Sequence, residues 1–275
     1  MAKLKKKYAE MMRNWRQHND VALESRMLAP GAGPYDVAVL NEVGFSQVTY
    51  SNLGSSSYLT DSKELAEREA LALDLEDIDC PDNSYDIVFV HGAIHHCRSP
   101  HRAICEMLRV SSRHVVFVEP NDSAFMRLMI RLGLSFPFEI AAVVDSGFVA
   151  GGVRNTDIPN WVFRWNTHEV KKLVLAFMPE RFVKVSGSPY WDFNIDEKEP
   201  AKRKLTKLKY VIKVFGAKNF LRILRASQRV ANFIPWVSAQ GNKFFCHIEK
   251  TPDYRPWISV TEQGASFNRE FRSGK

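Results

Sequence analysis

No apolar run in the 275-residue sequence approaches the roughly 20 residues that a membrane-spanning helix needs. The basic stretch near its start is not followed by the apolar segment of a secretory signal peptide. Only four cysteines occur, none in C-x-x-C spacing, which argues against a disulfide framework and against a zinc site built on cysteines. We therefore expect a cytoplasmic protein with reduced thiols.

Three nucleotide-binding signatures are also missing. The sequence has no G-x-x-x-x-G-K-[ST] segment, which would indicate a nucleoside triphosphate site. The turn Gly31-Ala32-Gly33 lacks the third glycine of the dinucleotide fingerprint, because Asp36 stands in its place. The Tyr-x-x-x-Lys pair of short-chain dehydrogenases is absent as well. These absences leave a nicotinamide-dependent oxidoreductase or epimerase as an alternative only.

Charge is unevenly distributed along the chain. The net charge of +7 combines +5 over residues 1–16, +10 over residues 198–229 and −8 over the remainder. Basic segments on an acidic body indicate contact with nucleic acid, an anionic membrane or an anionic small molecule, although two solvated helix faces would look the same. Because no nucleic-acid-binding module accompanies the charge, nucleic acid is the least favoured partner.

Short apolar runs alternate with helical patterns between residues 25 and 120. Residues 85–92 and 114–120 are nearly continuous apolar runs, as expected of strands buried on both faces of a parallel sheet. A helix is expected to begin at Ser99-Pro100, where serine supplies an N-cap and proline suits the first turn. Parallel strands need such crossovers, so the pattern predicts a doubly wound α/β sheet. The other expected elements are strands 25–29 and 47–53, a helix over 35–44, and a segment over 62–73 that begins as a helix and could run into a short strand.

The texture of the sequence divides the chain into five segments. We expect a helical segment over 1–24, a cofactor-binding half over 25–120, an insertion or lid over 121–165, the second half of the sheet over 166–250 with a basic helical insertion over 196–238, and a loose tail over 251–275. The last two strands are expected at 181–193 and 242–250. Four apolar residues of the basic insertion have helical spacing and are expected on one face of a helix that Gly216 interrupts: Leu205, Leu208, Ile212 and Phe215.

A longer motif spans residues 72–91, which read ALDLEDIDCPDNSYDIVFVH. It is followed by Ile94-His95-His96, by Leu108-Arg109-Val110 and by Val116-Phe117-Val118-Glu119-Pro120. The order and spacing resemble the core of class I S-adenosylmethionine (SAM)-dependent methyltransferases, especially the type 11 methyltransferase group. The resemblance covers residues 25–120. It implies a Rossmann-like, seven-stranded sheet with helical insertions, and SAM as the cofactor.

The resemblance also implies which residues bind this cofactor. The backbone of the first turn would pack against its amino-acid part, through Ala29, Gly31, Ala32 and Gly33. The acid that the family carries before its first glycine is replaced here by Ala29-Pro30.

Four further residues receive binding roles from the same resemblance. Asn52 stands where the family usually has an acid that binds both ribose hydroxyls; an amide accepts from one and donates to the other. Asp74, with the backbone of Leu75, would meet the adenine. His91 would lie beside the sulfonium and the carboxylate tail.

His95 and His96 are the candidate catalytic residues. They are expected just past a strand end, where ligands bind in open α/β sheets. The sulfonium cofactor carries an activated methyl group, so the protein must position the acceptor and, for a hydroxyl, remove a proton. Either imidazole is a candidate base with a pKa suited to neutral pH, although both could only shape the loop. Glu119 and Asp122 are lesser candidates. We expect no metal site: His91, His95 and His96 could form a cluster, but no carboxylate or cysteine spacing supports one.

We expect O-methylation of a small-molecule or glycan-type acceptor. The insertion over 121–165 and the helices around 200–235 would select it. Four side chains of the insertion could line a pocket for a sugar or an anionic group, although the two tryptophans could instead form its core: Arg154, Trp161, Arg164 and Trp165. The basic helices suit an anionic or lipid-linked acceptor and peripheral membrane contact. The alternatives are a non-catalytic SAM-binding or membrane-surface binding protein, and the nicotinamide-dependent oxidoreductase or epimerase.

Overall fold

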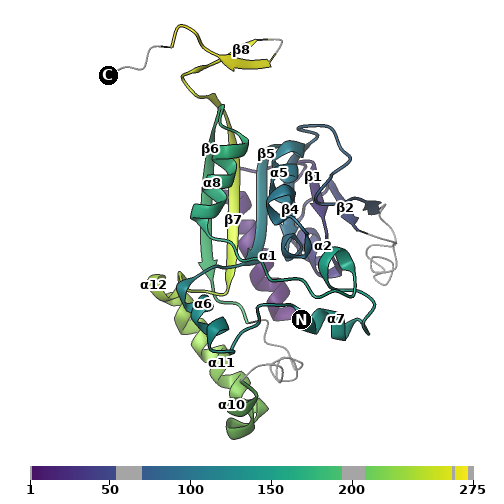
Figure 1. Ribbon diagram of the computed structural model, residues 1–275, viewed down its shortest axis with the longest axis vertical. Helices are drawn as coiled ribbons and strands as arrows, with labels where there is room; N and C mark the ends of the chain where they lie inside the picture. The colour runs from purple at the N-terminus through teal and green to yellow at the C-terminus, as the bar shows by residue number, and fades with distance from the viewer. Residues whose placement is uncertain (1, 54–69, 194–207, 262–263, 272–275) are drawn as a thin grey trace.

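The computed structural model describes residues 2–53, 70–193, 208–261 and 264–271 (Figure 1). Its centre is a seven-stranded sheet in the order β3-β2-β1-β4-β5-β7-β6. Strands β1 to β5 run parallel, and β7 pairs antiparallel with both β5 and β6. The predicted doubly wound, seven-stranded α/β sheet is therefore confirmed. Its strands are β1 (Met27–Pro30), β2 (Val48–Asn52), β3 (Ala70–Ala72), β4 (Tyr85–His91), β5 (Ser111–Pro120), β6 (Arg181–Tyr190) and β7 (Lys243–Tyr254).

Helices cover the sheet on both faces. Helices α1 (Ala2–His18) and α2 (Pro34–Val43) pack on one face, and α5 (Pro100–Val110) and α8 (Thr167–Phe177) on the other. Successive residues of β4 point to opposite cores: Phe89 packs with α1 and α2, whereas Val88 and Val90 pack with α5 and α8. Burial on both faces is why this strand is apolar without alternation.

Local signals in the sequence set several helix ends. The Ser99 hydroxyl accepts a hydrogen bond from the Arg102 amide, and Pro100 opens α5, as expected. Gly44 ends α2 in the left-handed conformation, with φ of +100°. Gly216, with φ of +73°, separates α10 (Leu208–Phe215) from α11 (Ala217–Phe233). Most of the segment over 62–73 lies outside the described residues, and its last part contains β3.

The insertion over 121–165 leaves the sheet and returns to it at the same place. The Trp165 amide donates to the Pro120 carbonyl (2.9 Å), and the Asp122 amide donates to the Trp165 carbonyl (2.8 Å). Between these ends lie α6 (Ala124–Arg131), α7 (Ile140–Asp145) and the short 3-10 helix η2 (Val153–Asn155). Trp165 is fully buried in the core of the sheet, in contact with Phe117. This tryptophan therefore anchors the insertion instead of lining a pocket.

The expectation of a loose tail over 251–275 was wrong for most of its described residues. Strand β7 continues to Tyr254, and an antiparallel hairpin follows, made of β8 (Ile258–Thr261) and β9 (Gly264–Phe267). This hairpin lies apart from the main sheet (Figure 1), and β9 is exposed throughout. Because β9 has no buried face, its sequence lacks the alternation of apolar and polar residues that predicts a strand. No helix among the described residues is both long enough and apolar enough to cross a membrane.

Candidate active site

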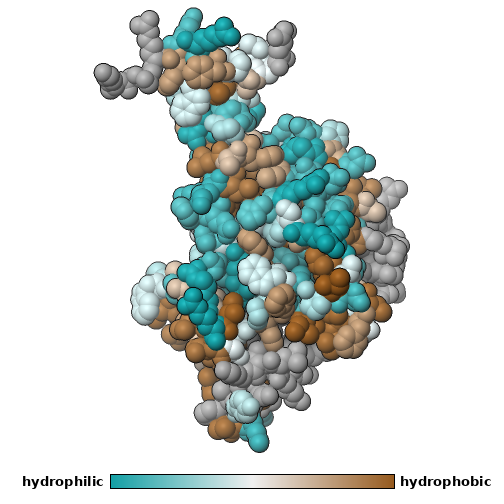
Figure 2. Space-filling view, viewed as in Figure 1, coloured by the Kyte–Doolittle hydropathy of each residue, from teal (hydrophilic) through white to brown (hydrophobic). Residues whose placement is uncertain are grey.

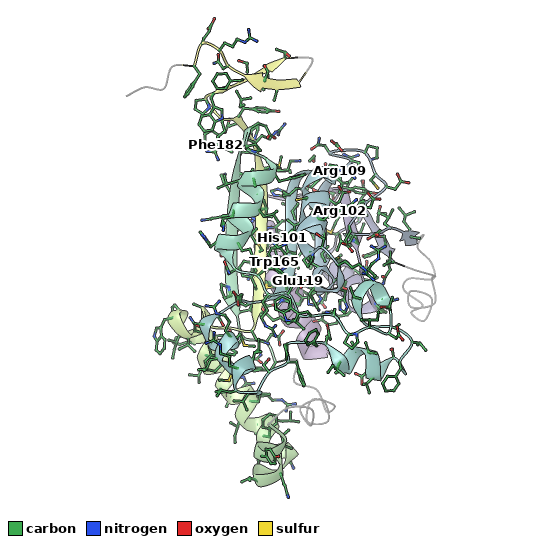
Figure 3. The ribbon with its side chains drawn as sticks, in the orientation of Figure 1. His101, Arg102, Arg109, Glu119, Trp165 and Phe182 are labelled. Carbon is green, nitrogen blue, oxygen red and sulfur yellow. The ribbon has the colours of Figure 1, made fainter. Side chains whose placement is uncertain are left out.

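The carboxyl ends of the parallel strands meet at one edge of the sheet. Strand β1 leads into the turn Gly31–Gly33, β4 ends at His91, and Glu119 lies at the end of β5. Figure 3 shows Glu119 toward the end of the molecule that carries α6, whereas Arg109, just before β5, lies toward the opposite end. Ligands of open α/β sheets bind outside this carboxyl edge.

Only glycine fits the first position of the turn. Gly31 has φ of +68°, and a Cβ built on it would lie 2.6 Å from the Cβ of Ala93. The Ala32 amide donates to the Ser51 carbonyl (3.1 Å), which ties the turn to β2. The backbone of the turn is therefore held close to the segment that follows β4. Ala29 is buried in β1 just before it, with 1% of its surface exposed.

Gly31→Ala is expected to lower the free energy of unfolding by about 1–3 kcal/mol, because it adds a clash to a backbone conformation that L-residues avoid. Urea unfolding would measure the loss. The double variant Gly31→Ala with Ala93→Gly removes the methyl that the new Cβ meets, so it should recover the steric part and keep the backbone part, about 1–2 kcal/mol. Equal losses in the single and double variants would contradict the contact with Ala93.

Asp36, in place of the third glycine, links the turn to His91. One carboxylate oxygen accepts from the Gly33 amide (2.9 Å) at the start of α2, and the other lies 2.9 Å from His91 Nδ1. The Tyr8 ring packs on the His91 ring, with centroids 4.6 Å apart. The sequence analysis did not predict the contacts of Asp36 with Gly33 and His91. The contact with Gly33 has a recognisable signal, because an acid three residues after a helix N-cap is typical of capping.

Asn52 is engaged with the turn instead of being free. Its Nδ2 donates to the Ala32 carbonyl (3.4 Å), and its Oδ1 accepts from the Leu53 amide (2.8 Å). The amide thus joins the end of β2 to the glycine turn. A ribose hydroxyl would have to share or replace these bonds.

Asp74 lies opposite an arginine of the insertion. Arg154 Nη2 is 2.7 Å from Asp74 Oδ2, and its Nη1 is 3.3 Å from Glu76 Oε2. Asp74 Oδ1 also accepts from the Glu76 amide (2.9 Å). Leu75, which lies between Asp74 and Glu76 in the sequence, is buried. The insertion therefore closes onto the loop that follows β3, and Arg154 binds this loop instead of an open pocket.

His95 is held between two glutamates. It lies on the short 3-10 helix η1 (Ile94–His96) directly after β4. Its Nδ1 is 2.6 Å from Glu119 Oε2, and its Nε2 is 3.0 Å from Glu139 Oε2. Burial lowers the pKa of His95, but the two carboxylates outweigh it and raise that pKa to about 9. This differs from the near-neutral pKa that we expected of a base, because both glutamates favour the charged imidazole.

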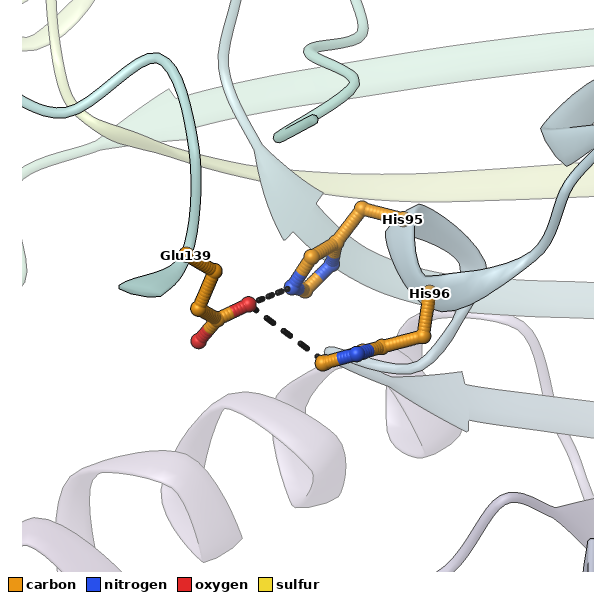
Figure 4. Close-up of side chains that lie close together, drawn as sticks. All are labelled: His95, His96 and Glu139. Atoms are coloured by element: carbon orange, nitrogen blue, oxygen red, sulfur yellow. Dashed lines mark hydrogen bonds and ion pairs between the residues drawn. The ribbon is translucent and has the colours of Figure 1, made fainter. Parts of the chain in front are cut away.

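His96 meets the same glutamate from the other side (Figure 4). Its Nδ1 lies 3.2 Å from the Gly152 carbonyl oxygen, and its Nε2 lies 3.4 Å from Glu139 Oε2. Burial and the neighbouring His95 lower the pKa of His96, although Glu139 partly opposes them. We call His95, His96 and Glu139 the histidine–glutamate cluster. His91 is not part of it, and Asp122, the other lesser candidate, pairs with Arg127 (2.7 Å).

Residues 28–118 match the sequence model of the methyltransferase domain family. No curated protein matches the sequence. Among solved structures, the YcgJ protein of Bacillus subtilis is 14% identical, with a TM-score of 0.48 over 90% of this chain and 98% of its own. A SAM-dependent methyltransferase of Archaeoglobus fulgidus is 12% identical, with a TM-score of 0.44 over 88% and 94%. Magnesium protoporphyrin IX methyltransferase of Synechocystis, solved with S-adenosylhomocysteine (SAH), is 12% identical, with a TM-score of 0.42 over 65% and 74%.

The family match begins in β1 and ends in β5, so it includes the glycine turn after β1 and η1 after β4. The match and the strand order support a class I SAM-dependent methyltransferase domain over residues 28–118, the kind of domain that uses SAM as its cofactor. The match goes against the nicotinamide-dependent alternative. Two features near the turn fit an adenosyl cofactor: Gly31 carries no Cβ, and the buried hydroxyls of Tyr8 and Ser51 have no hydrogen-bond partner within the described part of the chain.

Proposed function

We propose that the chain transfers the methyl group of SAM to a hydroxyl of a small-molecule or glycan-type acceptor. The cofactor, when bound, supplies an already activated methyl group. The protein has to align the two reactants and take up the hydroxyl proton. The observation that carries the proposal is the histidine–glutamate cluster beside the glycine turn: Ala93, two residues before His95, is the residue that Gly31 approaches.

The cofactor would bind along the carboxyl edge of β1 to β4. The backbone of Ala29, Gly31, Ala32 and Gly33 is our candidate for its amino-acid end, where close approach is possible because Gly31 has no side chain. Asn52 is proposed for the ribose, and Asp74 with Leu75 for the adenine. His91, held by Asp36, is proposed for the sulfonium end.

The acceptor side is assigned to His95 and His96, the proposed catalytic residues. Both belong to the segment directly after β4, and the insertion over 121–165 covers them through Glu139 and the Gly152 carbonyl. The insertion and the basic segment over 196–238 would then select the acceptor, while residues 25–120 hold the cofactor. A hydroxyl brought to the cluster would find the Glu139 carboxylate and the His96 imidazole, groups able to accept its proton, beside His95, whose charged form the two glutamates favour.

An anionic or lipid-linked acceptor is favoured by the surface of α10, α11 and the short helix α12 (Pro235–Ser238). Six large apolar side chains there are more than half exposed: Tyr210, Val214, Ile223, Val230, Phe233 and Trp236. The cations Lys213, Lys218, Arg222, Arg225 and Arg229 lie on the same two long helices. Figure 2 shows apolar surface at this lower end of the molecule. Apolar groups flanked by cations are typical of helices that lie on an anionic membrane.

This surface predicts binding to vesicles that contain phosphatidylglycerol and weaker binding to vesicles of phosphatidylcholine alone. Added salt should weaken the binding, because it screens the attraction between cations and lipid headgroups. Replacing Phe233 and Trp236 by serine should release the protein from the vesicles in a sedimentation assay. Phe267→Ser is the matched control, since this exposed aromatic lies in the distant β8–β9 hairpin. Equal binding to both vesicle types would contradict the proposal.

The experiment that tests the proposed function is calorimetric titration of the purified protein with SAH, with NAD and NADP in parallel. Micromolar binding of SAH alone is expected, and it would justify a screen of hydroxylated acceptors with labelled SAM. No binding of SAH at millimolar concentration by folded protein would refute the proposal.

A further inference from the structure

The two imidazoles of the histidine–glutamate cluster are both held at Nδ1. His95 Nδ1 faces the fully buried Glu119 (2.6 Å), and His96 Nδ1 faces the Gly152 carbonyl oxygen (3.2 Å). An acceptor at Nδ1 keeps a hydrogen on that atom and leaves Nε2 as the atom that the ring presents. Histidines that bind a metal through Nε2 are oriented in this way, by a carboxylate or a backbone carbonyl behind the ring.

Both Nε2 atoms converge on one oxygen, Glu139 Oε2, at 3.0 and 3.4 Å (Figure 4). The ligand atoms of the three side chains all lie within 4.8 Å of one another. Two ligand atoms that are each about 2.0–2.2 Å from one ion, at octahedral or tetrahedral angles, are about 2.8–3.6 Å apart. The two separations from Glu139 are therefore those of neighbouring ligands around one ion.

A hydrogen bond does not account for the contact between His96 and Glu139. The Nε2 atom of His96 lies 3.4 Å from Glu139 Oε2, beyond the 2.7–3.2 Å of a well-formed hydrogen bond. The Gly152 carbonyl oxygen faces Nδ1 of the same ring, so a hydrogen on Nδ1 leaves the Nε2 lone pair directed at the carboxylate. A cation between them would turn this contact into an attraction.

The groups around the cluster include more carboxylates and acceptors than donors, which favours a bound cation. Two carboxylates, Glu119 and Glu139, face the single imidazole of His95. Asn160, which is 3% exposed, donates from Nδ2 to the His95 carbonyl (3.0 Å), and its Oδ1 has no hydrogen-bond partner in the described ranges. An unpaired buried acceptor therefore adjoins the cluster.

We propose that His95 Nε2, His96 Nε2 and the Glu139 carboxylate bind one divalent transition-metal ion, whose binding releases to solvent the proton that His95 Nε2 shares with Glu139. Two imidazoles and one carboxylate suit Zn²⁺, Fe²⁺, Co²⁺ or Ni²⁺ better than Mg²⁺ or Ca²⁺, which prefer oxygen ligands. Three protein ligands leave coordination positions open, as in metal sites that take a substrate oxygen. Binding of the acceptor hydroxyl at such a position rests on the proposed function, whereas binding of the ion does not.

The test uses the full-length protein without an affinity tag, stripped of metal with a chelator. Co²⁺ is titrated while the visible absorption of its d–d bands is followed, and Zn²⁺ is titrated by calorimetry, with Mg²⁺ as the hard-cation comparison. One equivalent of Co²⁺ is expected to bind and to be displaced by Zn²⁺. Glu139→Gln should weaken Zn²⁺ binding by at least about tenfold, since even outer partners of metal sites contribute about 10–100-fold.

Glu169→Gln is the matched control. Glu169 also faces a histidine, His101, at 3.4 Å, but among the described residues this pair belongs to no group of three possible metal ligands. Thermal unfolding of each variant shows whether it is folded. Equal Zn²⁺ affinity in wild type and Glu139→Gln, or binding of Mg²⁺ as tight as that of Zn²⁺, would overturn the proposal. A thiolate-to-cobalt charge-transfer band would do the same, because it would place the ion on a cysteine such as Cys97.

Titration of the same metal-free samples with SAH separates the two proposals. SAH binding without any metal binding would leave the proposed function standing and reduce the cluster to a charged histidine between two glutamates. Metal binding without SAH binding would refute the proposed function and leave the metal site standing.

Discussion

Asp74→Ala is expected to weaken SAH binding by about 10–100-fold, because a hydrogen bond to a charged group contributes about 1.5–3 kcal/mol. The Asp74 carboxylate already accepts from the Glu76 amide and from Arg154. A carboxylate offers about four acceptor sites, so it retains the capacity to accept from the exocyclic amine of adenine. The neighbouring Leu75 is buried, which fixes the loop that presents this carboxylate.

Asp77→Ala is the matched control for this prediction. Asp77 lies in the same loop, but its side chain is 79% exposed and pairs only with Arg102 among the contacts described. Asp74→Asn should give an intermediate loss, because it keeps an oxygen for the Glu76 amide and removes the charge. Urea unfolding would check that the loop survives in all three variants. If Asp74→Ala and Asp77→Ala bind SAH equally well, Asp74 is not the adenine residue.

The central strands were predictable because consecutive residues carry the signal of each strand. Strands β4 and β5 are buried on both faces, so each appears as a continuous apolar run. The start of α5 was also predictable, because an N-cap serine and a proline in the first turn are adjacent in the sequence, at Ser99 and Pro100. The number of strands came from the family resemblance, and no local signal distinguished the antiparallel β7 from the parallel strands. The β8–β9 hairpin was missed because it has no buried face.

The site was only partly predictable, because its remaining partners are distant in sequence. His95 and His96 could be found, since they follow a recognisable strand end. Glu139 could not, because it lies in an irregular insertion whose contact with η1 depends on how the chain returns at Trp165. Arg154 was expected near a pocket, yet it pairs with Asp74 from across the same insertion. Periodicity reports which face of an element is buried and says nothing of such contacts.

A second pair of histidines, His114 on β5 and His247 on β7, is expected to make the protein unstable in acid. The two rings share a hydrogen bond (3.0 Å), and both make near-perpendicular contacts with the Trp15 ring. The pKa of each is lowered from 6.5 to about 4, chiefly by burial; His247 adds to the shift of His114, Arg113 adds to both, and Glu249 partly offsets them. Protonation would place two cations side by side within the sheet.

The sign of the effect follows from these pKa values. Between pH 6.5 and 4 the unfolded chain takes up protons on both histidines and the folded protein does not, so the free energy of unfolding falls as pH falls. At about 1.4 kcal/mol per unit of pKa, and allowing for some solvent access, the pair should contribute a loss of about 3–5 kcal/mol across this range.

Urea unfolding at a series of pH values from 7 to 4 measures this loss. The double variant His114→Gln with His247→Gln keeps a hydrogen-bonding pair that does not titrate, so its stability should depend less on pH. His18→Gln, which replaces a histidine outside the sheet on α1, is the control and should follow the wild type. A parallel decline of wild type and double variant would assign the acid sensitivity to other groups, because these two imidazoles would then have the same pKa in the folded and unfolded chain.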